Sequence, residues 1–327
     1  MGLERVLQET LNDPMGEHVL LPIRETFHPL GFPVEIATNS QEVLEAARES
    51  WGMFRPEFER VPIRIRVVVE DGAREPAPEP VYRTQRGLLL IVSDRDNFAC
   101  CDLRSRFGWC HIAANMLADR GWFRWFFLEA MVYLLLNQDD VVSIHAACVA
   151  RSGRGVLLCG ASGAGKSTFA YACAKAGWTY LTDDATILIQ GSREREALGK
   201  PYQLRFRPEA VELFPEIAGH SACIKPNGKP TVEVSIRAFP QIATAARCRV
   251  ECIVFLNRVR GSSPLARPLP PEEAFERILQ ELPAYSEEVQ SRYRETVVAL
   301  LSAPAYELEY QSFNEAIPLL CRLVDES

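Results

Sequence analysis

The residues with the clearest chemical potential form a glycine-rich run in the middle of the chain. The run satisfies the pattern G-x-x-x-x-G-K-[ST]. It reads Gly160-Ala161-Ser162-Gly163-Ala164-Gly165-Lys166-Ser167. The glycines let backbone N–H groups turn toward phosphate oxygens, and Lys166 reaches the β- and γ-phosphates. The Ser167 hydroxyl is a ligand for Mg²⁺, and Thr168 follows it in the loop. The run therefore predicts a P-loop that binds ATP with Mg²⁺.

The flanking segments are those that a phosphate-binding loop needs. The apolar run Gly155–Cys159 predicts a strand before the loop, and Phe169–Gly177 predicts a helix after it that ends at Gly177. A helix that begins near Lys166 points its positive end at bound phosphate. The alternative is a glycine-rich turn without a ligand, which does not require this context.

Two carboxylates follow the next expected strand. The segment Trp178–Thr182 predicts a strand, and Asp183 and Asp184 come directly after it. Functional residues of such folds lie at the carboxyl ends of the strands beside the loop. One carboxylate can hold Mg²⁺ while the other takes the proton from an attacking hydroxyl. A switch-type NTPase needs only the metal ligand, so the pair favours a kinase. The alternative is a turn in which the aspartates cap backbone N–H groups.

A histidine precedes this region at a regular distance. The apolar segment Val141–Ala150 predicts a strand that contains His145. His145 stands 21 residues before Lys166 (145 to 166), and Asp183 stands 17 residues after it (166 to 183). A lone histidine in a strand is usually structural, so its role depends on what these spacings resemble.

The run HAACVARSGRGVLLCGASGAGKSTFAYACAKAGWTYLTDD resembles the catalytic domain of the HPr kinase/phosphorylase family. The shared features are a histidine, an apolar strand, GxSGxGKS with Ser162 as its serine, a helix and an Asp-Asp pair. The downstream segments YQLRFRPEAVELF, CIVFLNR and AYELEY resemble a looser set of HPr-kinase-like proteins. The specific resemblance covers about forty residues of the chain and leaves the first 130 or so uncovered.

The resemblance implies a fold related to phosphoenolpyruvate carboxykinase and phosphoryl transfer from ATP to a serine hydroxyl. It implies that one aspartate of the pair is the base and that His145 lies beside the transferring phosphate. We choose Asp183 as the base, with Asp184 and Ser167 on Mg²⁺, and the opposite assignment of the two aspartates stays open. The resemblance is also compatible with a homo-oligomer. The family sequence GKSE is GKST here, and its second signature, E-x-R-G-x-G, is not found. The expected acceptor is therefore a serine of a peptide or protein other than HPr, or a small molecule. An ATP-binding regulatory module and a simple NTPase are the alternatives.

Further basic residues could meet phosphate. Arg205 and Arg207 flank Phe206, so on a strand both would point to one face, where two guanidinium groups suit a phosphate or carboxylate. A solvated strand face is the equal alternative. Lys225 and Lys229 flank an Asn-Gly turn and are weaker candidates.

The composition limits the classes of function. The 327 residues carry a net charge of −7 without an obvious basic stretch, which argues against nucleic acid as a partner. The 10 cysteines are scattered in apolar runs, as expected of reduced cysteines in a cytoplasmic protein. A zinc site at Cys100, Cys101, Cys110 and His111 is a minor alternative, because no CxxC pair is present. The apolar segment Trp122–Leu136 is too short to span a bilayer, and the N-terminus lacks the apolar core of a signal peptide.

The remaining pattern predicts an α/β protein with two domains. Residues 1–137 form an N-terminal mixed α/β accessory domain, and 138–327 form the P-loop catalytic domain of the HPr kinase type. Residues 1–30 predict a helix and a polar loop, and Gly191–Lys200 predicts a surface loop, with a substrate-facing element as the alternative. Other predicted strands are Phe32–Thr38, Ile63–Val69, Leu88–Ser93, Phe98–Leu103, Cys248–Leu256 and Tyr306–Tyr310, and other predicted helices are Gln41–Trp51 with Ser40 as N-cap, Glu272–Glu281 and Asn314–Val324.

Overall fold

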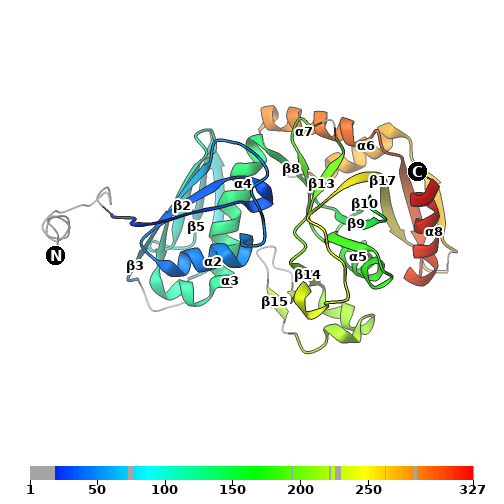
Figure 1. Cartoon of the computed structure of the whole chain (residues 1–327), viewed down its shortest axis with the longest axis horizontal. Helices are drawn as coiled ribbons and strands as arrows, with labels where there is room; N and C mark the ends of the chain where they lie inside the picture. The colour runs from blue at the N-terminus through cyan, green and yellow to red at the C-terminus, as the bar shows by residue number, and fades with distance from the viewer. Residues whose placement is uncertain are drawn as a thin grey trace, which may run out of the picture. The chain divides into compact units, whose positions relative to one another are not determined.

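The protein is an α/β protein with mixed sheets (Figure 1). The computed structural model describes residues 19–72, 77–192, 194–220, 222–224, 230–261, 263–282 and 286–326. Contacts divide the chain into two compact units, Met1–Gln138 and Asp139–Ser327. Each unit has its own sheet and its own covering helices, so each is described by itself.

The first unit is built on a seven-stranded sheet of order β1-β2-β3-β7-β6-β5-β4. Its strands are β1 (Ile23–Phe27), β2 (Val34–Thr38), β3 (Ile63–Glu70), β4 (Val81–Gln85), β5 (Leu88–Val92), β6 (Phe98–Asp102) and β7 (Phe107–Ala113). Strands β2, β3 and β7 are parallel, and all other pairs are antiparallel. Alternation in β3 places Ile63 and Ile65 in the core and leaves Arg64 exposed.

Helices cover one face of this sheet. They are α2 (Gln41–Trp51), α3 (Arg120–Phe123), the π-helical segment η3 (Arg124–Leu128) and α4 (Glu129–Asp139). Helix α2 begins after Ser40, but the Ser40 side chain makes no capping hydrogen bond. Met131 of α4 packs close to Gly108 of β7, and the Tyr82 hydroxyl of β4 donates to the Phe126 carbonyl at 2.8 Å. The inward side chains of the sheet are therefore buried under helices.

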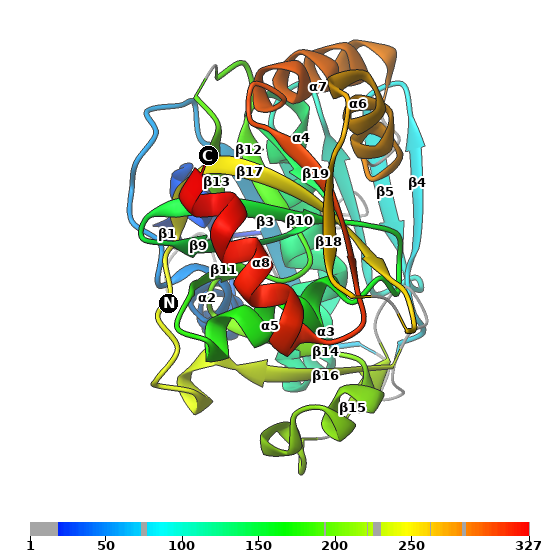
Figure 2. The same cartoon turned by 90° about the vertical axis from the view of Figure 1, so that its right-hand side faces the viewer.

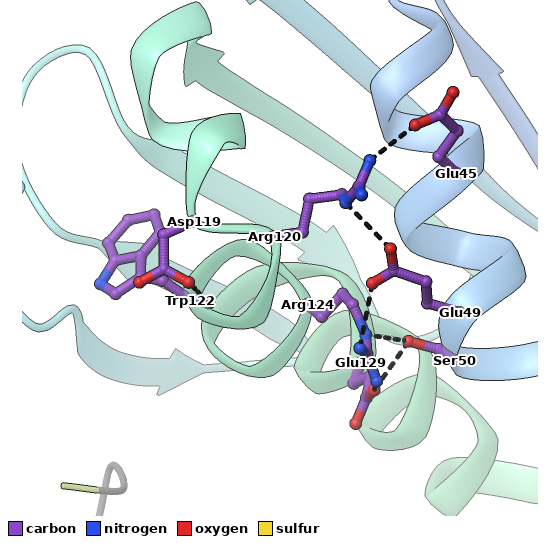
Figure 3. A network of polar contacts seen from close by, with 8 residues as sticks. All are labelled: Glu45, Glu49, Ser50, Asp119, Arg120, Trp122, Arg124 and Glu129. Carbon is purple, nitrogen blue, oxygen red and sulfur yellow. Dashed lines mark hydrogen bonds and ion pairs between the residues drawn. The ribbon is translucent and has the colours of Figure 1, made fainter. Parts of the chain in front are cut away.

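A polar network joins α2 to the α3–α4 segment (Figure 3). The Arg124 Nε donates to the Ser50 hydroxyl at 2.7 Å, and that hydroxyl donates to Glu129 at 2.7 Å. Arg124 also pairs with Glu49 at 3.2 Å, and Arg120 pairs with Glu49 at 2.9 Å. Ser50 and Glu129 are buried, so the hydrogen bonds compensate for the loss of water around them.

The second unit is built on a nine-stranded sheet of order β11-β9-β10-β17-β13-β12-β8, with β19 also pairing β17 and β18. Its strands are β8 (Val141–Ile144), β9 (Ala147–Arg151), β10 (Arg154–Cys159), β11 (Thr179–Thr182), β12 (Thr186–Ile189), β13 (Glu196–Leu198), β17 (Arg247–Arg258), β18 (Leu265–Pro268) and β19 (Ala305–Tyr310). Helices α5 (Lys166–Lys175) and α8 (Phe313–Glu326) share one core with the sheet, and α6 (Pro271–Gln280) and α7 (Glu287–Leu300) share another. The sheet is therefore covered on both faces (Figure 2).

A small sheet of order β14-β16-β15 extends the core beside α5. Its strands are β14 (Gln203–Phe206), β15 (Ala222–Ile224) and β16 (Pro230–Ser235). Tyr171 of α5 makes edge contacts with the rings of Phe206, Phe214 and Phe239. This packing fixes β14 against α5, the helix that follows the glycine-rich run.

Several predicted elements need correction. The single strand expected at Val141–Ala150 is two strands, β8 and β9, separated by His145 and Ala146. The surface loop expected at Gly191–Lys200 contains β13, whose Ala197 and Leu198 are buried. In the N-terminal segment predicted as helix and loop, residues 1–18 lie outside the described residues, and Ile23–Phe27 forms a strand. Among the described residues, no helix has both the length and the apolar character needed to cross a membrane.

Candidate active site

The glycine-rich run connects β10 to α5 in a tight turn. Gly160, Gly163 and Gly165 have φ angles of 145°, 93° and 91°, which side-chain-bearing residues rarely adopt. A Cβ atom at Gly160 would also lie 3.0 Å from Ala164 Cβ and 3.2 Å from the Leu256 carbonyl oxygen. The glycines are therefore required by the backbone path. The same path leads into the N-terminus of α5, where free N–H groups and the helix dipole favour an anion.

Lys166 and Ser167 begin α5 and face the end of a neighbouring strand. The Lys166 ammonium is buried and donates to the carbonyl oxygens of Gly160 and Ala161. The Ser167 hydroxyl donates to the Asp183 carbonyl oxygen at 3.2 Å. Strands β10 and β11 are both antiparallel to β9, so they run in the same direction and end at one edge. This topology brings the loop and the aspartate pair together.

Asp183 is a buried carboxylate with a perturbed titration. Its side chain is 4% exposed, and Oδ2 accepts from the Arg205 backbone N–H at 2.7 Å. Burial raises the pKa of Asp183 to about 7, although the Arg205 charge lowers it, and the Asp184 charge adds to the rise. Asp183 therefore changes protonation near neutral pH.

Asp184 has the opposite character. Its carboxylate is 46% exposed, and it lies 3.3 Å from His145 Nδ1 and 3.4 Å from an Arg205 guanidinium nitrogen. Partial burial would raise the pKa of Asp184, but the hydrogen bond from His145 and the Arg205 charge outweigh it and lower the pKa. Asp184 is therefore ionised and accessible over the physiological range.

The break between β8 and β9 explains how His145 reaches the pair. His145 Nδ1 also lies 3.0 Å from the Asp184 carbonyl oxygen, and the His145 backbone N–H donates to the Glu281 carbonyl oxygen at 3.3 Å. Thr186 of β12 donates to the Ala146 carbonyl oxygen at 2.9 Å, which fixes the break. The histidine is thus held against Asp184 rather than within a strand.

Only one of the two candidate arginines lies at the aspartate pair. Arg205 contacts Asp184 and also pairs with Glu233 of β16 at 3.4 Å. Burial would lower the pKa of Arg205, but the surrounding carboxylates raise it, so the guanidinium is permanently charged. Arg207 follows the end of β14 and is exposed, so the expectation of both side chains on one strand face is wrong. Lys225 and Lys229 lie outside the described residues.

Lys200 and Glu281 were not singled out in the sequence. Gly199 packs directly on the β11 backbone, since a Cβ atom there would lie 2.4 Å from the Leu181 carbonyl oxygen. This places Lys200 close enough to Asp184 for its charge to contribute to the lowered pKa. Glu281 directly follows α6, and its carbonyl oxygen accepts from the His145 backbone N–H. Burial raises the pKa of Cys159, the residue before the loop, to about 12, and the Glu281 charge adds to the rise. A glycine before a lysine was the sole sequence signal for Lys200.

The cysteine–histidine group of the first unit does not form a metal site. Cys101 and Cys110 are buried, while His111 contacts the Asp96 carbonyl oxygen at 2.9 Å and Glu70 at 3.1 Å. In the described part of the chain, no three His, Cys, Asp or Glu residues gather as metal ligands would. Zinc at this group is therefore unsupported.

Comparison with known proteins gives limited matches. A family model described as "SynChlorMet cassette protein ScmC" matches residues 108–202, which is less than a third of the chain. No curated protein matches the chain. Among solved structures, the Hpr(Ser) kinase/phosphatase from Coxiella burnetii matches at 16% identity and a TM-score of 0.29. That match covers 56% of this chain and 93% of the other.

Proposed function

We propose that this protein is an ATP- and Mg²⁺-dependent kinase that transfers the γ-phosphoryl group to a hydroxyl of a peptide, a protein or a small molecule. The observation that carries the proposal is the contact between the glycine-rich run and the aspartate pair. Ser167 at the start of α5 donates to the Asp183 backbone at 3.2 Å. The glycine-rich run, the Ser167 hydroxyl and the two carboxylates thus lie at one edge of the sheet, where the proposed triphosphate and Mg²⁺ would bind.

The residues of the loop fit a triphosphate with Mg²⁺. Gly160, Gly163 and Gly165 have positive φ angles and no side chain, so their backbone could approach a phosphate closely. Lys166 supplies a buried positive charge. Ser167 and the ionised Asp184 are the proposed Mg²⁺ ligands, and Mg²⁺ would neutralise charge on the phosphates.

Asp183 is the proposed general base. With a pKa of about 7, it is matched to accept a proton near neutral pH. The acceptor hydroxyl loses its proton to Asp183, its oxygen bonds to the γ-phosphorus, and the bond from that phosphorus to the β–γ bridging oxygen breaks to release ADP. Asp184, which keeps its charge, is the poorer base. His145 is a positioning residue in this scheme, because it holds the Asp184 carboxylate at 3.3 Å.

Transfer of labelled phosphate tests the proposal. We expect the protein to transfer phosphate from γ-labelled ATP to one species in a cell or metabolite extract, and Asp183→Asn to abolish transfer while retaining ATP affinity. Asp325→Asn is the matched control, because Asp325 is an exposed carboxylate that pairs with Arg151, at the opposite end of β9 and β10 from the glycine-rich run. Lys166→Ala should weaken binding of a fluorescent ATP analogue by at least about tenfold.

The outcomes of this assay separate the alternatives. Release of inorganic phosphate without an acceptor would indicate a simple NTPase. Binding of ATP with neither transfer nor release would indicate a regulatory module. Undiminished transfer by Asp183→Asn would overturn the assignment of Asp183 as base.

A further inference from the structure

The first unit carries an apolar surface on the sheet face opposite its helices. Alternate residues of β5 point away from the buried core, where Leu89 and Ile91 lie. The outward residues Leu88, Leu90 and Val92 are 47%, 44% and 44% exposed. Val81 of β4 pairs with Val92 and is 47% exposed. These four residues are called the apolar face below, and β4 and β5 lie side by side in Figure 2.

Aromatic side chains continue the apolar face toward the middle of the sheet. Phe98 of β6 pairs with Val92, and its ring lies 5.4 Å from Trp109 and 5.5 Å from His111. In the sheet register, Cys100 of β6 pairs with Leu90 of β5 on one side and with Trp109 of β7 on the other. Few proteins expose to solvent a contiguous apolar surface that spans four strands. Such a surface marks an interaction site.

Arginines flank this surface on both sides. Arg83 of β4 pairs with Leu90, and farther along the same row Arg66 of β3 pairs with Trp109. Both arginines are exposed, and Arg66 lies over the Phe107 ring at 5.6 Å. The apolar side chains of this row therefore lie between two positive charges.

The turn between β4 and β5 adds to the positive charge. Arg86 and Gly87 have φ angles of 48° and 86° and form the turn, and the Arg104 side chain lies beside Gly87. The neighbouring carboxylate of Asp102 accepts from the backbone N–H groups of Arg104 and Ser105 at 3.0 and 3.3 Å. Asp102 is thus engaged by its own turn.

We propose that the apolar face binds an amphipathic peptide segment of the phosphoryl acceptor, with its apolar side chains on Leu88, Leu90 and Val92 and acidic side chains at Arg83 and Arg66. This inference rests on the proposed function, since it assigns the acceptor to the peptide class. The positive charges of Arg83 and Arg66 favour a partner that places acidic side chains beside them. A second copy of this chain fits less well, because face-to-face pairing would bring two sets of flanking arginines to one contact.

Binding of a defined probe to the full-length protein tests this inference without nucleotide. The probe is a fluorescein-labelled, 18-residue amphipathic peptide with leucines on one face, glutamates on its flanks and one serine. Matched peptides carry lysine in place of glutamate, or serine in place of leucine. By fluorescence anisotropy, we expect each matched peptide to bind at least about tenfold more weakly than the glutamate peptide.

Protein variants locate the binding surface. Leu90→Gln and Arg83→Glu should each weaken the glutamate peptide by at least about tenfold, and Val298→Gln should not. Val298 is the control because it is an exposed apolar residue on α7, in the second unit. Equal binding of the glutamate and lysine peptides, or equal affinity of Leu90→Gln and Val298→Gln, would overturn the inference. So would a Leu90→Gln variant that dissociates a dimer in sedimentation velocity, because a second copy would then cover the face.

These experiments distinguish a loss of peptide binding from a loss of phosphoryl transfer. Asp183→Asn should bind the probe as the wild type does and lose only transfer. A probe that binds through the apolar face but is not phosphorylated supports the docking surface. The kinase activity is then tested by the assay with γ-labelled ATP and an extract. A probe that is phosphorylated equally well by Leu90→Gln, with an unchanged KM, contradicts the docking surface and supports the kinase.

Discussion

At the residue scale, adjacent aspartates of one chain have pKa values shifted in opposite directions. Asp183 is buried and its pKa is raised to about 7, whereas Asp184 faces His145 and Arg205 and its pKa is lowered. Environments that shift the pKa values of two carboxylates in opposite directions are typical of sites where one carboxylate transfers a proton and the other keeps its charge. We therefore expect the stability of the protein and the proposed phosphoryl transfer to depend on pH through Asp183.

The sign of this dependence follows from the Asp183 pKa. The folded-state value of about 7 lies above the ordinary value of 3.8, so the folded protein binds the proton more tightly than the unfolded chain. Stability associated with Asp183 is fully present below its ordinary pKa and is lost as pH rises through about 7. We expect Asp183→Asn to be more stable than the wild type at pH 8.5, by at least about 1 kcal/mol, since one pKa unit is worth about 1.4 kcal/mol.

Urea unfolding at pH 5 and pH 8.5 measures this difference. The stability advantage of Asp183→Asn should shrink at pH 5, where the wild-type carboxyl is protonated in the folded state. Asp325→Asn, at an exposed carboxylate, is the control. An advantage of the same size at both pH values would contradict a raised Asp183 pKa.

Lys200 supplies a second residue-scale prediction. Its charge helps to lower the pKa of Asp184, and Gly199 places it there by packing on the Leu181 backbone. We expect Lys200→Met to raise the Asp184 pKa and Lys200→Arg to restore it. Titration of the Asp184 carboxyl carbon by NMR measures both variants. A pKa that is the same in Lys200→Met and the wild type would show that the lysine does not act on this carboxylate.

At the element scale, the long periodic elements could be predicted and the short ones could not. The strand before the glycine-rich run and the helix after it were expected from apolar pattern and glycine position, and both form. The break at His145 could not be predicted, because the flanking residues Ile144 and Ala146 are apolar, as they would be in a continuous strand. Strand β13 was missed because only tertiary pairing with β12 and β17 orders Glu196–Leu198.

The same limit applies to the site. The glycines, Lys166 and Ser167 belong to one motif, and the aspartate pair follows the next strand along the chain, so their proximity could be predicted. Arg205 reaches the pair from another sheet, and whether Arg205 or Arg207 would do so depended on where β14 ends. Glu281 comes from the end of α6, about a hundred residues later, and no spacing rule connects it to the loop.

The network in Figure 3 gives an element-scale prediction about stability. Glu129 accepts from the buried Ser50 hydroxyl and pairs with Arg124 at 3.4 Å, so Glu129→Ala removes the acceptor of a buried hydroxyl and one of the two carboxylates beside Arg124. We expect a loss of about 2 kcal/mol in the free energy of unfolding of the first unit. Glu45→Ala is the matched control, because Glu45 and Arg120 are both exposed and such pairs contribute less than about 1 kcal/mol. Equal losses in urea unfolding would show that the network does not hold α2 to α3–α4.

At the scale of the whole molecule, the proposed chemistry and the proposed docking surface belong to different units. Every residue proposed for ATP, Mg²⁺ and proton transfer lies in Asp139–Ser327, and the apolar face lies in Met1–Gln138. The two buried cores of the second unit, around Phe169 and around Tyr293, are built from its own residues. A unit with its own cores is expected to fold alone.

This separation predicts the behaviour of a fragment. We expect residues 139–327 to unfold cooperatively and to bind a fluorescent ATP analogue within about threefold of the full-length affinity, because the contacts described above for the loop and the aspartate pair are made by residues of this unit. The fragment should lose binding of the glutamate peptide, which the full-length protein retains. Lys166→Ala in the fragment is the control for specific nucleotide binding. A folded fragment that binds the peptide as tightly as the full chain would place the acceptor surface in the second unit, and one that unfolds without cooperativity would show that this unit depends on the first for its core.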